Sequence, residues 1–263
     1  MDLRLSGKRA LICGGSSGLG RAVATALVAE GAHVALLSRD AAKLQAVADE
    51  LNAMGPGRAV IAPADLADHA SLLTAVDVAE AALGGPIEIL LNNTGGPPPS
   101  GVSGLEPDLW RAQFEAMVLS IFRLTDRVLP GMKAMGWGRL LNVASITVVE
   151  PVASLGVSNT LRASVTAWAK TLAGEVAPHG ITVNTLLPGR IDTPRIERLD
   201  AARAAAHGIT PEQARAEATA GIPVGRLGTP EEFGAVAAFL ASPQAAYVTG
   251  SLIRLDGGAV RAI

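Results

Sequence analysis

The sequence predicts an α/β fold: a single Rossmann-type, doubly wound domain, with helices on both faces of a parallel sheet of about seven strands. Short apolar segments alternate with longer amphipathic segments along the 263 residues. This alternation is typical of parallel strands joined by right-handed helical crossovers. The first apolar segment also ends in a glycine-rich turn that opens a helix. A chain of this length can bury one sizeable core, so we expect one domain over residues 1–263.

Each expected strand is short, nearly continuous in apolar residues, and closed by Gly, Pro, Asn or Asp. Such continuous apolar segments are typical of strands that are covered on both faces. The expected strands are residues 9–13, 33–37, 59–62, 87–91, 138–143, 181–186 and 252–255. The expected helices are residues 18–30, 41–52, 69–82, 107–135, 154–177 and 230–241. Residues 194–222 are rich in alanine and charge, and we expect them to form a helical lid.

The composition excludes several classes of partner. A net charge of −2 provides no field that would attract nucleic acid or an anionic membrane. Cys13 is the only cysteine, so no disulfide or thiolate metal cluster can form within the chain, and we expect no bound metal. The sequence shows neither a secretory signal nor a run of about 18 apolar residues. We therefore expect a cytoplasmic protein with a small-molecule substrate.

The glycine-rich turn follows the first expected strand directly. Gly14, Gly18 and Gly20 allow a tight turn and let backbone amides approach a pyrophosphate at the helix N-terminus. A turn of this kind also joins many ordinary strands and helices. Its position in the first strand–helix–strand unit favours a dinucleotide site.

The end of the second expected strand indicates which dinucleotide binds. An acidic residue there would bond the ribose 2′-hydroxyl of NAD and repel the 2′-phosphate of NADP. Ser38 occupies this place and Arg39 follows it, which offers a guanidinium to the phosphate. We therefore expect NADP(H) to be preferred over NAD(H). The alternative is a solvated Arg39 that pairs with Asp40.

Five motifs in order resemble the short-chain dehydrogenase/reductase family over essentially the whole chain. They are the turn at 13–20, with Cys in place of the family's Thr, Asp65-Leu66, the Asn-Asn-Thr-Gly turn at 92–95, the Pro-Gly segment at 188–193, and the closing residues 247–250 with 256–258. The resemblance implies a cofactor-binding set. This set is Gly14, Ser16, Ser17, Gly18, Leu19, Gly20, Ser38, Arg39, Asp65, Leu66, Asn93, Gly95, Arg162, Pro188, Gly189, Ile191 and Thr193.

The resemblance also implies a reaction centre made of Asn, Ser and a Tyr-x-x-x-Lys pair. Ser145 occupies the serine position. The other positions carry Met117 for Asn, Ser158 for Tyr and Arg162 for Lys. The only tyrosine is Tyr247, near the last strand, so no alignment restores the pair. Ser145, Ser158 and Arg162 are therefore the candidate catalytic residues.

These replacements change the available chemistry. Carbonyl reduction needs a proton donor at the developing alkoxide, and serine is a much weaker acid than tyrosine. Arg162 stays protonated, but it can hold ribose hydroxyls, an oxyanion or a carboxylate. Glu150 and Arg190 are candidate substrate contacts, which would suit an anionic substrate. The alternative is that Glu150 and an arginine form an ion pair that braces the loops.

Three functions stay open. The first is an NADP(H)-dependent oxidoreductase that acts on a carbonyl or hydroxyl group, similar to 3-oxoacyl reductases, with a non-standard active site. The second is a non-redox enzyme of the same fold that catalyses elimination, isomerisation or carbon–carbon cleavage. The third is a catalytically inactive dinucleotide-binding or sensor protein. The resemblance further implies a homodimer or homotetramer.

Overall fold

The computed structural model describes residues 2–262 and contains one seven-stranded, wholly parallel sheet with the strand order β3-β2-β1-β4-β5-β6-β7. This arrangement confirms the expected doubly wound α/β fold. The order reverses between β1 and β4, which is where such sheets open a crevice for ligands. The strands are β1 (Arg9–Cys13), β2 (His33–Leu37), β3 (Arg58–Ile61), β4 (Ile89–Asn92), β5 (Gly138–Val143), β6 (Ile181–Pro188) and β7 (Leu252–Leu255).

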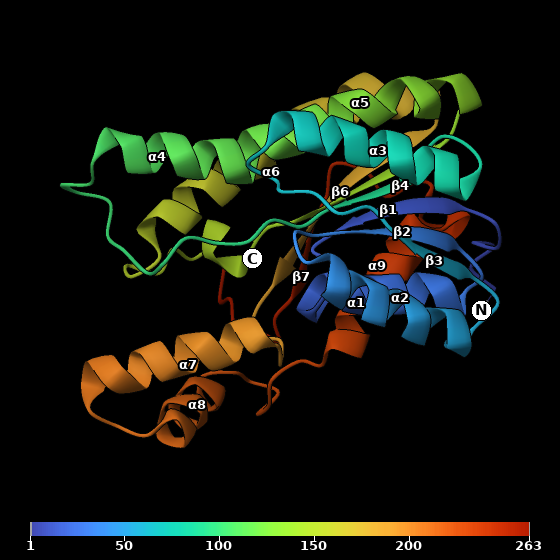
Figure 1. The fold of residues 1–263 in the computed structure, drawn as a ribbon. Coiled ribbons are helices and arrows are strands. Elements are labelled where there is room, and N and C mark those ends of the chain that lie inside the picture. Colours follow the sequence, from blue (N-terminus) through green and yellow to red (C-terminus); the bar gives the residue numbers. More distant parts are fainter. Residues whose placement is uncertain (1, 263) are drawn as a thin grey trace.

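Helices cover both faces of the sheet (Figure 1). One layer contains α3 (His69–Leu83), α5 (Ser120–Met135) and α6 (Gly156–Val176). The other contains α1 (Gly18–Ala29), α2 (Ala41–Met54) and α9 (Pro230–Ala241). Among residues 2–262, no helix is both long enough and apolar enough to cross a membrane.

The expected helix over residues 107–135 has an irregular middle. It consists of α4 (Pro107–Phe114), a π-helical turn η1 (Glu115–Leu119) and α5. A π turn inside a helix inserts a residue and changes the direction in which its side chains point. The sequence pattern alone did not reveal this turn, because the change is a single residue.

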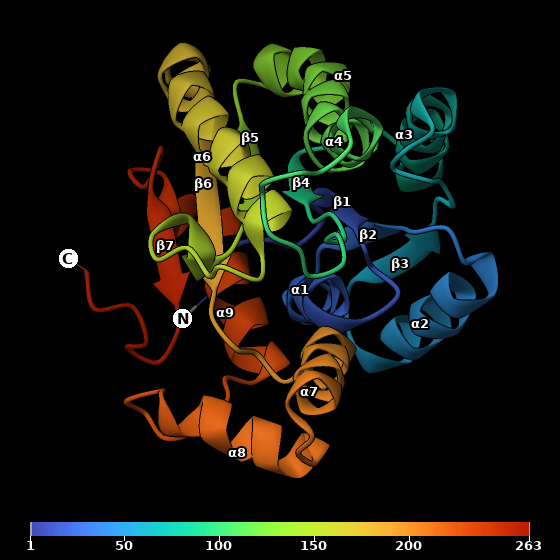
Figure 2. The same ribbon diagram turned by 90° about the vertical axis from the view of Figure 1, so that its left-hand side faces the viewer.

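The segment expected to form a lid contains two helices, α7 (Pro194–His207) and α8 (Pro211–Ala220). Thr210 and Gln213 form a capping box that starts α8, and Gly208 ends α7 in the left-handed conformation. In Figure 2, α7 lies next to α1, at the edge of the sheet from which the carboxyl ends of the strands emerge. Helix α7 is therefore placed to cover a ligand at that edge.

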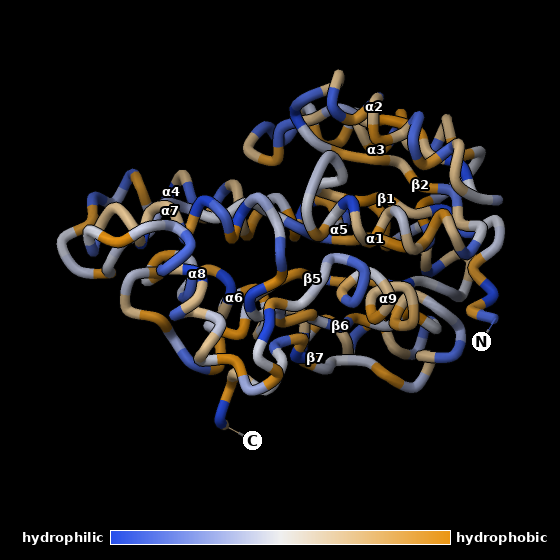
Figure 3. Tube along the Cα trace, turned by 90° about the horizontal axis from the view of Figure 1, so that it is seen from below, coloured by the Kyte–Doolittle hydropathy of each residue, from blue (hydrophilic) through white to orange (hydrophobic). Residues whose placement is uncertain are grey.

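The core consists of two aliphatic layers, one on each face of the sheet. Residues such as Ile12 and Leu36 face the α1–α2–α9 layer, whereas Leu11 and Leu37 face the opposite layer. The alternation of these residues shows why the strands are apolar throughout. Figure 3 shows the same contrast, with hydrophobic strands at the centre and hydrophilic turns outside.

Polar side chains join the carboxyl ends of neighbouring strands. The Asn93 side-chain amide donates a hydrogen bond to the carbonyl oxygen of Cys13 at 3.2 Å, and so links the ends of β4 and β1. Asn92 donates to Asn142 at 2.9 Å and to Thr125 at 3.2 Å, which links β4, β5 and α5. These hydrogen bonds hold the ends of β1, β4 and β5 in place, where the ligand-facing loops begin.

Gly20 packs directly against the turn that precedes it. A Cβ at Gly20 would lie 2.3 Å from the carbonyl oxygen of Gly14. We therefore expect Gly20→Ala to displace the turn, to lower the melting temperature in calorimetry and to weaken dinucleotide binding. Gly174→Ala is the matched control, because its Cβ meets no atom within 4 Å and alanine favours a helix by about 0.5–1 kcal/mol. Equal melting temperatures for the two variants would contradict this account of the turn.

Candidate active site

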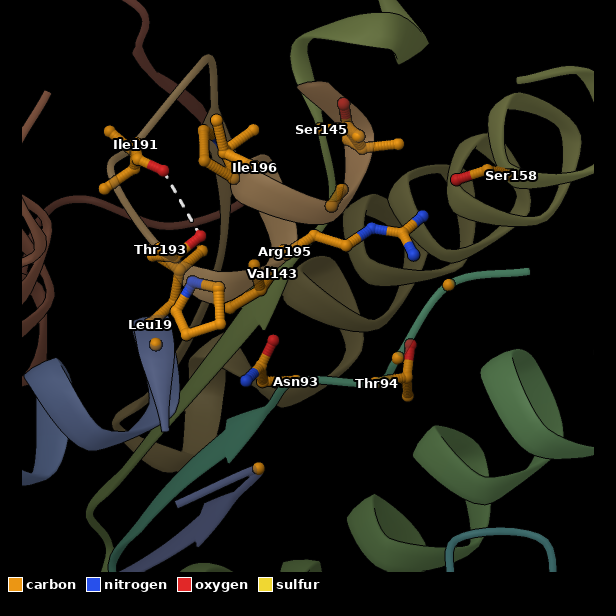
Figure 4. Close-up of a pocket in the computed structure, with 18 of the residues that line it drawn as sticks. Leu19, Asn93, Thr94, Val143, Ser145, Ser158, Ile191, Thr193, Arg195 and Ile196 are labelled. Atoms are coloured by element: carbon orange, nitrogen blue, oxygen red, sulfur yellow. Dashed lines mark hydrogen bonds between the residues drawn. The ribbon is translucent and has the colours of Figure 1, made fainter. Parts of the chain in front are cut away.

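A cavity of about 400 Å³ opens at the carboxyl ends of β1, β4, β5 and β6 (Figure 4). It contains most of the residues expected at the cofactor and reaction sites. Those lining it are Gly14, Ser17, Gly18, Leu19, Asn93, Gly95, Ser145, Ser158, Arg162, Pro188, Gly189, Ile191 and Thr193. Ser16, Gly20, Ser38, Arg39, Asp65 and Leu66 lie outside its lining.

The glycine-rich turn has the geometry that a phosphate site requires. Gly14 and Gly18 adopt φ angles of 67° and 53°, in the left-handed region that favours glycine. Ser17 caps α1 without a side-chain hydrogen bond, so the first amides of the helix are available to a ligand. A side chain at Gly14 would also meet the Asn93 amide at 2.7 Å. The turn therefore fits the pyrophosphate of a dinucleotide.

The end of β2 carries two features that suit an adenosine 2′-phosphate. The Ser38 hydroxyl is buried and has no hydrogen-bond partner among the described residues. Arg39 is exposed, and its neighbour Asp40 binds Lys43 at 3.2 Å instead. The amide and side chain of Lys43 hold the pKa of Asp40 below its usual value. The expected alternative, an Arg39–Asp40 pair, does not form in this structure.

Asp65 and Leu66 follow β3 at the same edge of the sheet. The Asp65 carboxylate accepts a hydrogen bond from the Ala67 amide at 3.0 Å, while Leu66 packs against the core. Asp65 thus shapes the turn after β3. Because β3 neighbours β2, this turn lies beside the Ser38–Arg39 strand end.

Arg162 fixes the walls of the pocket. Its Nε donates to the Ser158 hydroxyl at 3.2 Å, and its two terminal nitrogens donate to the carbonyl oxygens of Val143 at 3.0 Å and Gly95 at 3.3 Å. The guanidinium thereby joins α6 to the ends of β5 and β4. A guanidinium has five N–H groups, so two are left over from these three bonds.

The charge of Arg162 is poorly compensated. No carboxylate within residues 2–262 forms a salt bridge with it, in contrast to surface arginines such as Arg21, Arg111 and Arg203. Burial, followed by the charge of Arg195, lowers the pKa of Arg162 to about 10. The side chain therefore stays protonated at neutral pH, and an anion would stabilise it.

Two serine hydroxyls face the same cavity. Ser145 accepts a hydrogen bond from the Thr147 amide at 3.2 Å, and Ser158 accepts the bond from Arg162. Each hydroxyl keeps its own proton for donation. Because each already accepts an N–H, its ability to donate is strengthened. The pair can hold a ligand oxygen, but neither group is an effective acid near neutral pH.

Met117 lies in an apolar cluster rather than at the cavity. It is 4% exposed and packs with Val118, Ile121, Val157 and Leu161 between η1 and α6. The position that the family resemblance assigns to asparagine is therefore hydrophobic here. An amide at this place would lie among aliphatic side chains.

Glu150 and Arg190 are not brought to the cavity. The Glu150 carboxylate accepts hydrogen bonds from the Arg261 and Ala262 amides, so it binds the C-terminal segment. Arg190 forms an ion pair with the buried carboxylate of Asp200 on α7. The expected pairing of Glu150 with an arginine side chain is thus replaced by two separate contacts, both outside the cavity lining.

Sequence reasoning missed the residues that α7 contributes. Arg195, Ile196, Arg198 and Leu199 line the cavity opposite Ser145 and Ser158. The only available signal was charge within the expected lid, and charge on a helix usually faces solvent. The cavity contains three arginines and no acidic residue, although the chain as a whole has a net charge of −2.

Comparisons with known proteins agree with this architecture. A family model described as enoyl-(acyl carrier protein) reductase matches residues 14–260. The 3-oxoacyl-(acyl-carrier-protein) reductase of Vibrio cholerae is 34% identical over 258 residues, 97% of this chain and 98% of the relative. The D-beta-hydroxybutyrate dehydrogenase of Cupriavidus necator is 35% identical over 259 residues, with the same coverage of 97% and 98%.

Two solved structures superpose closely on the chain. The L-sorbose reductase of Gluconobacter frateurii, complexed with NADPH and L-sorbose, gives a TM-score of 0.94 at 31% identity and covers 100% of both chains. YwfH, an NADPH-dependent reductase involved in bacilysin biosynthesis, gives a TM-score of 0.92 at 28% identity, covering 97% of this chain and 99% of the other. The chain thus shares its fold with these reductases.

The apolar surroundings of Met117 predict the cost of placing an amide there. We expect Met117→Asn to lower the free energy of unfolding by about 1–3 kcal/mol, because the buried amide would lack partners. Met117→Leu, which keeps the volume and polarity, should cost less than about 1.5 kcal/mol. Urea unfolding followed by circular dichroism measures both values. A Met117→Asn protein as stable as the parent would mean that this cluster admits water or a polar partner.

Proposed function

The chain belongs to the short-chain dehydrogenase/reductase family, and from this premise we propose that it is an NADP(H)-dependent oxidoreductase acting on a carbonyl or hydroxyl group. The observation that carries the proposal is one cavity that joins the dinucleotide turn at Gly14 and Gly18 to the hydroxyls of Ser145 and Ser158. A dinucleotide seated on the turn extends toward those hydroxyls. The relatives named as reductases and dehydrogenases support the same reaction class.

NADP(H) is the proposed cofactor. Arg39 supplies an unpaired cation and Ser38 a buried, unpartnered hydroxyl at the end of β2. Both suit a 2′-phosphate, and Ser38 stands at the position where an acidic residue would repel it. The turn at Gly14 to Gly20 would hold the pyrophosphate, and Pro188, Ile191 and Thr193 would enclose the nicotinamide end. The bound cofactor would supply or accept the hydride.

We propose that the active site is non-standard, with Ser158 and Arg162 in place of the family's Tyr and Lys. Ser145 and Ser158 would hold the reacting oxygen through their hydroxyl protons. Arg162 would keep Ser158 in place and stabilise negative charge as it develops on that oxygen. With no acidic side chain at the cavity, the proton would come from water.

The proposal extends to the substrate and the assembly. The substrate would be a small molecule, and an anionic one suits a cavity lined by arginines. We propose a homodimer or homotetramer, because the large apolar side chains of Leu109 and Phe114 stay exposed on α4. The buried, reduced Cys13 suits a cytoplasmic protein, and burial raises the pKa of this thiol to about 12.

Cofactor preference depends on Arg39. NADPH should bind more tightly than NADH, and Arg39→Ala should remove most of the difference, because a charge-assisted contact contributes about 1.5–3 kcal/mol, or roughly ten- to a hundredfold in affinity. Lys43→Ala is the matched control, since it removes a charge four residues further along the chain that already pairs with Asp40. Titration calorimetry measures the affinities. Equal binding of NADPH and NADH by the unmodified chain would refute the proposed preference.

The missing phenol predicts poor reduction of simple ketones. Turnover with NADPH should lie at least about a hundredfold below that of a relative with Tyr-x-x-x-Lys, the low end of a general acid's contribution. Combining Ser158→Tyr with Arg162→Lys should raise ketone reduction roughly ten- to a hundredfold, a partial gain because Met117 stays apolar.

Arg162→Lys alone is the control, and it should show no gain because it supplies no acid. NADPH binding and circular dichroism establish that each variant is folded. If the double variant does not fold, Ser158→Tyr alone is tested in its place. A folded, NADPH-binding variant that carries the phenol but gains nothing on a panel of ketones would contradict the assignment of Ser158 to the acid position.

A further inference from the structure

Three arginines reach the cavity without an acidic partner among residues 2–262. Arg162 comes from α6, while Arg195 and Arg198 come from the first turns of α7. Neighbouring arginines behave differently: Arg190 pairs with Asp200, and Arg203 pairs with Glu217 at 2.8 Å. The α7 segment therefore neutralises the arginines that point elsewhere and leaves those at the cavity uncompensated.

Arg162 and Arg195 lie close together. Their terminal nitrogens stand 3.6 Å and 3.1 Å from the position that a Cβ of Gly96 would occupy. A Cβ at Gly96 would therefore touch both guanidinium groups, and the contact with Arg195 would be a tight one. Burial and the charge of Arg198 also hold the pKa of Arg195 below its usual value. Two like charges in a shared, partly buried space are unfavourable unless an anion joins them.

The direction of Arg195 separates this pair from the phosphate turn. Figure 4 shows its side chain crossing the cavity away from Leu19, at the start of α1, and toward the region between Ser145, Ser158 and Thr94. One terminal nitrogen donates to the carbonyl oxygen of Pro97 at 3.3 Å, on the loop after β4. The guanidinium therefore lies on the side of the proposed reaction centre.

We infer that Arg195, together with Arg162 and with Arg198 at the rim, forms a carboxylate subsite, so that the substrate is a small oxo acid or hydroxy acid. This inference rests on the proposed function. The planar guanidinium matches a carboxylate through two parallel hydrogen bonds, and Arg162 has two N–H groups left for a ligand. The serine hydroxyls would hold the reacting oxygen while the arginines hold the acid group.

The remaining walls of the subsite are apolar. Leu155, Ile196 and Leu199 supply apolar surface around the arginines. An apolar wall strengthens the attraction between the guanidinium groups and a carboxylate, because it excludes water. A neutral ketone or a thioester carried on a protein has no charge to offer here. The subsite therefore selects a free acid over its ester.

The test uses the full chain loaded with NADP⁺, so that binding is measured without turnover. The probes are 2-oxobutanoate and acetoacetate, each compared with its methyl ester by titration calorimetry. At least one acid should bind roughly ten- to a hundredfold more tightly than its ester, the effect of one charge-assisted contact. Arg195→Ala should remove this difference and leave NADP⁺ affinity unchanged. Arg195→Lys, which keeps the charge without the planar group, should restore only part of it.

Arg203→Ala is the matched control on the same helix, and it should bind acid and cofactor like the parent. Equal binding of acid and ester, or no binding of either acid, would overturn the subsite while leaving the proposed function intact. The subsite would also be overturned if Arg195→Ala lowered the affinity for NADP⁺ by the same factor as the affinity for the acid. Arg195 would then bind the pyrophosphate of the cofactor. Failure of the unmodified chain to bind NADPH or NADP⁺ would instead overturn the proposed function, and the subsite with it.

Discussion

The guanidinium of Arg162 is the interaction on which the pocket depends. It reaches from α6 to the carbonyl oxygens at the ends of β4 and β5, where parallel strands leave unpaired groups pointing at the ligand. A lysine could make only some of these hydrogen bonds, because its ammonium lacks the planar, forked set of N–H donors of a guanidinium. The same charge has no carboxylate partner among the described residues. The side chain that braces the two strand ends therefore leaves an uncompensated positive charge at the cavity. Rigidity and anion attraction thus arise from one side chain.

The replacement of a phenol by Ser158 fits this arrangement. An arginine does not raise the acidity of a neighbouring serine hydroxyl enough to make it a general acid at neutral pH. It can, however, orient the hydroxyl and stabilise negative charge that forms beside it. A site built in this way suits reactions in which charge is held in place and the proton arrives later from water. Met117 agrees with that interpretation, because it contributes an apolar side chain to the cluster between η1 and α6 where the family resemblance places an amide.

The fold followed from the sequence because its determinants are local. The continuous apolar strands and the glycine turn at 14–20 each depend on a few consecutive residues, and the observed strands begin and end within two residues of those expected.

The site was only partly predictable. Positions such as Ser145 and Arg162 sit at fixed strand and helix ends, whereas Glu150 and Arg190 acquire their partners from residues 261–262 and from Asp200. Such partners depend on how loops and α7 fold back, and no local pattern specifies them. The π turn η1 was hidden for a related reason, since it alters side-chain direction without altering composition.

Arg195 shows why charge on a lid has to be interpreted from pairing rather than from composition. Helix α7 carries several arginines, and in the sequence they are equivalent. In the structure, Arg203 is matched by a glutamate of α8, while Arg195 turns inward, donates to the Pro97 carbonyl and has no carboxylate partner among residues 2–262. Leaving a cation unpaired beside Arg162 costs stability, because the two charges repel each other in partly buried surroundings. Strain of this kind persists at sites where a ligand relieves it. A ligand carboxylate would relieve it by neutralising both arginines. Because Arg195 comes from α7 and Arg162 from α6, the same carboxylate would also join these two helices across the reaction centre.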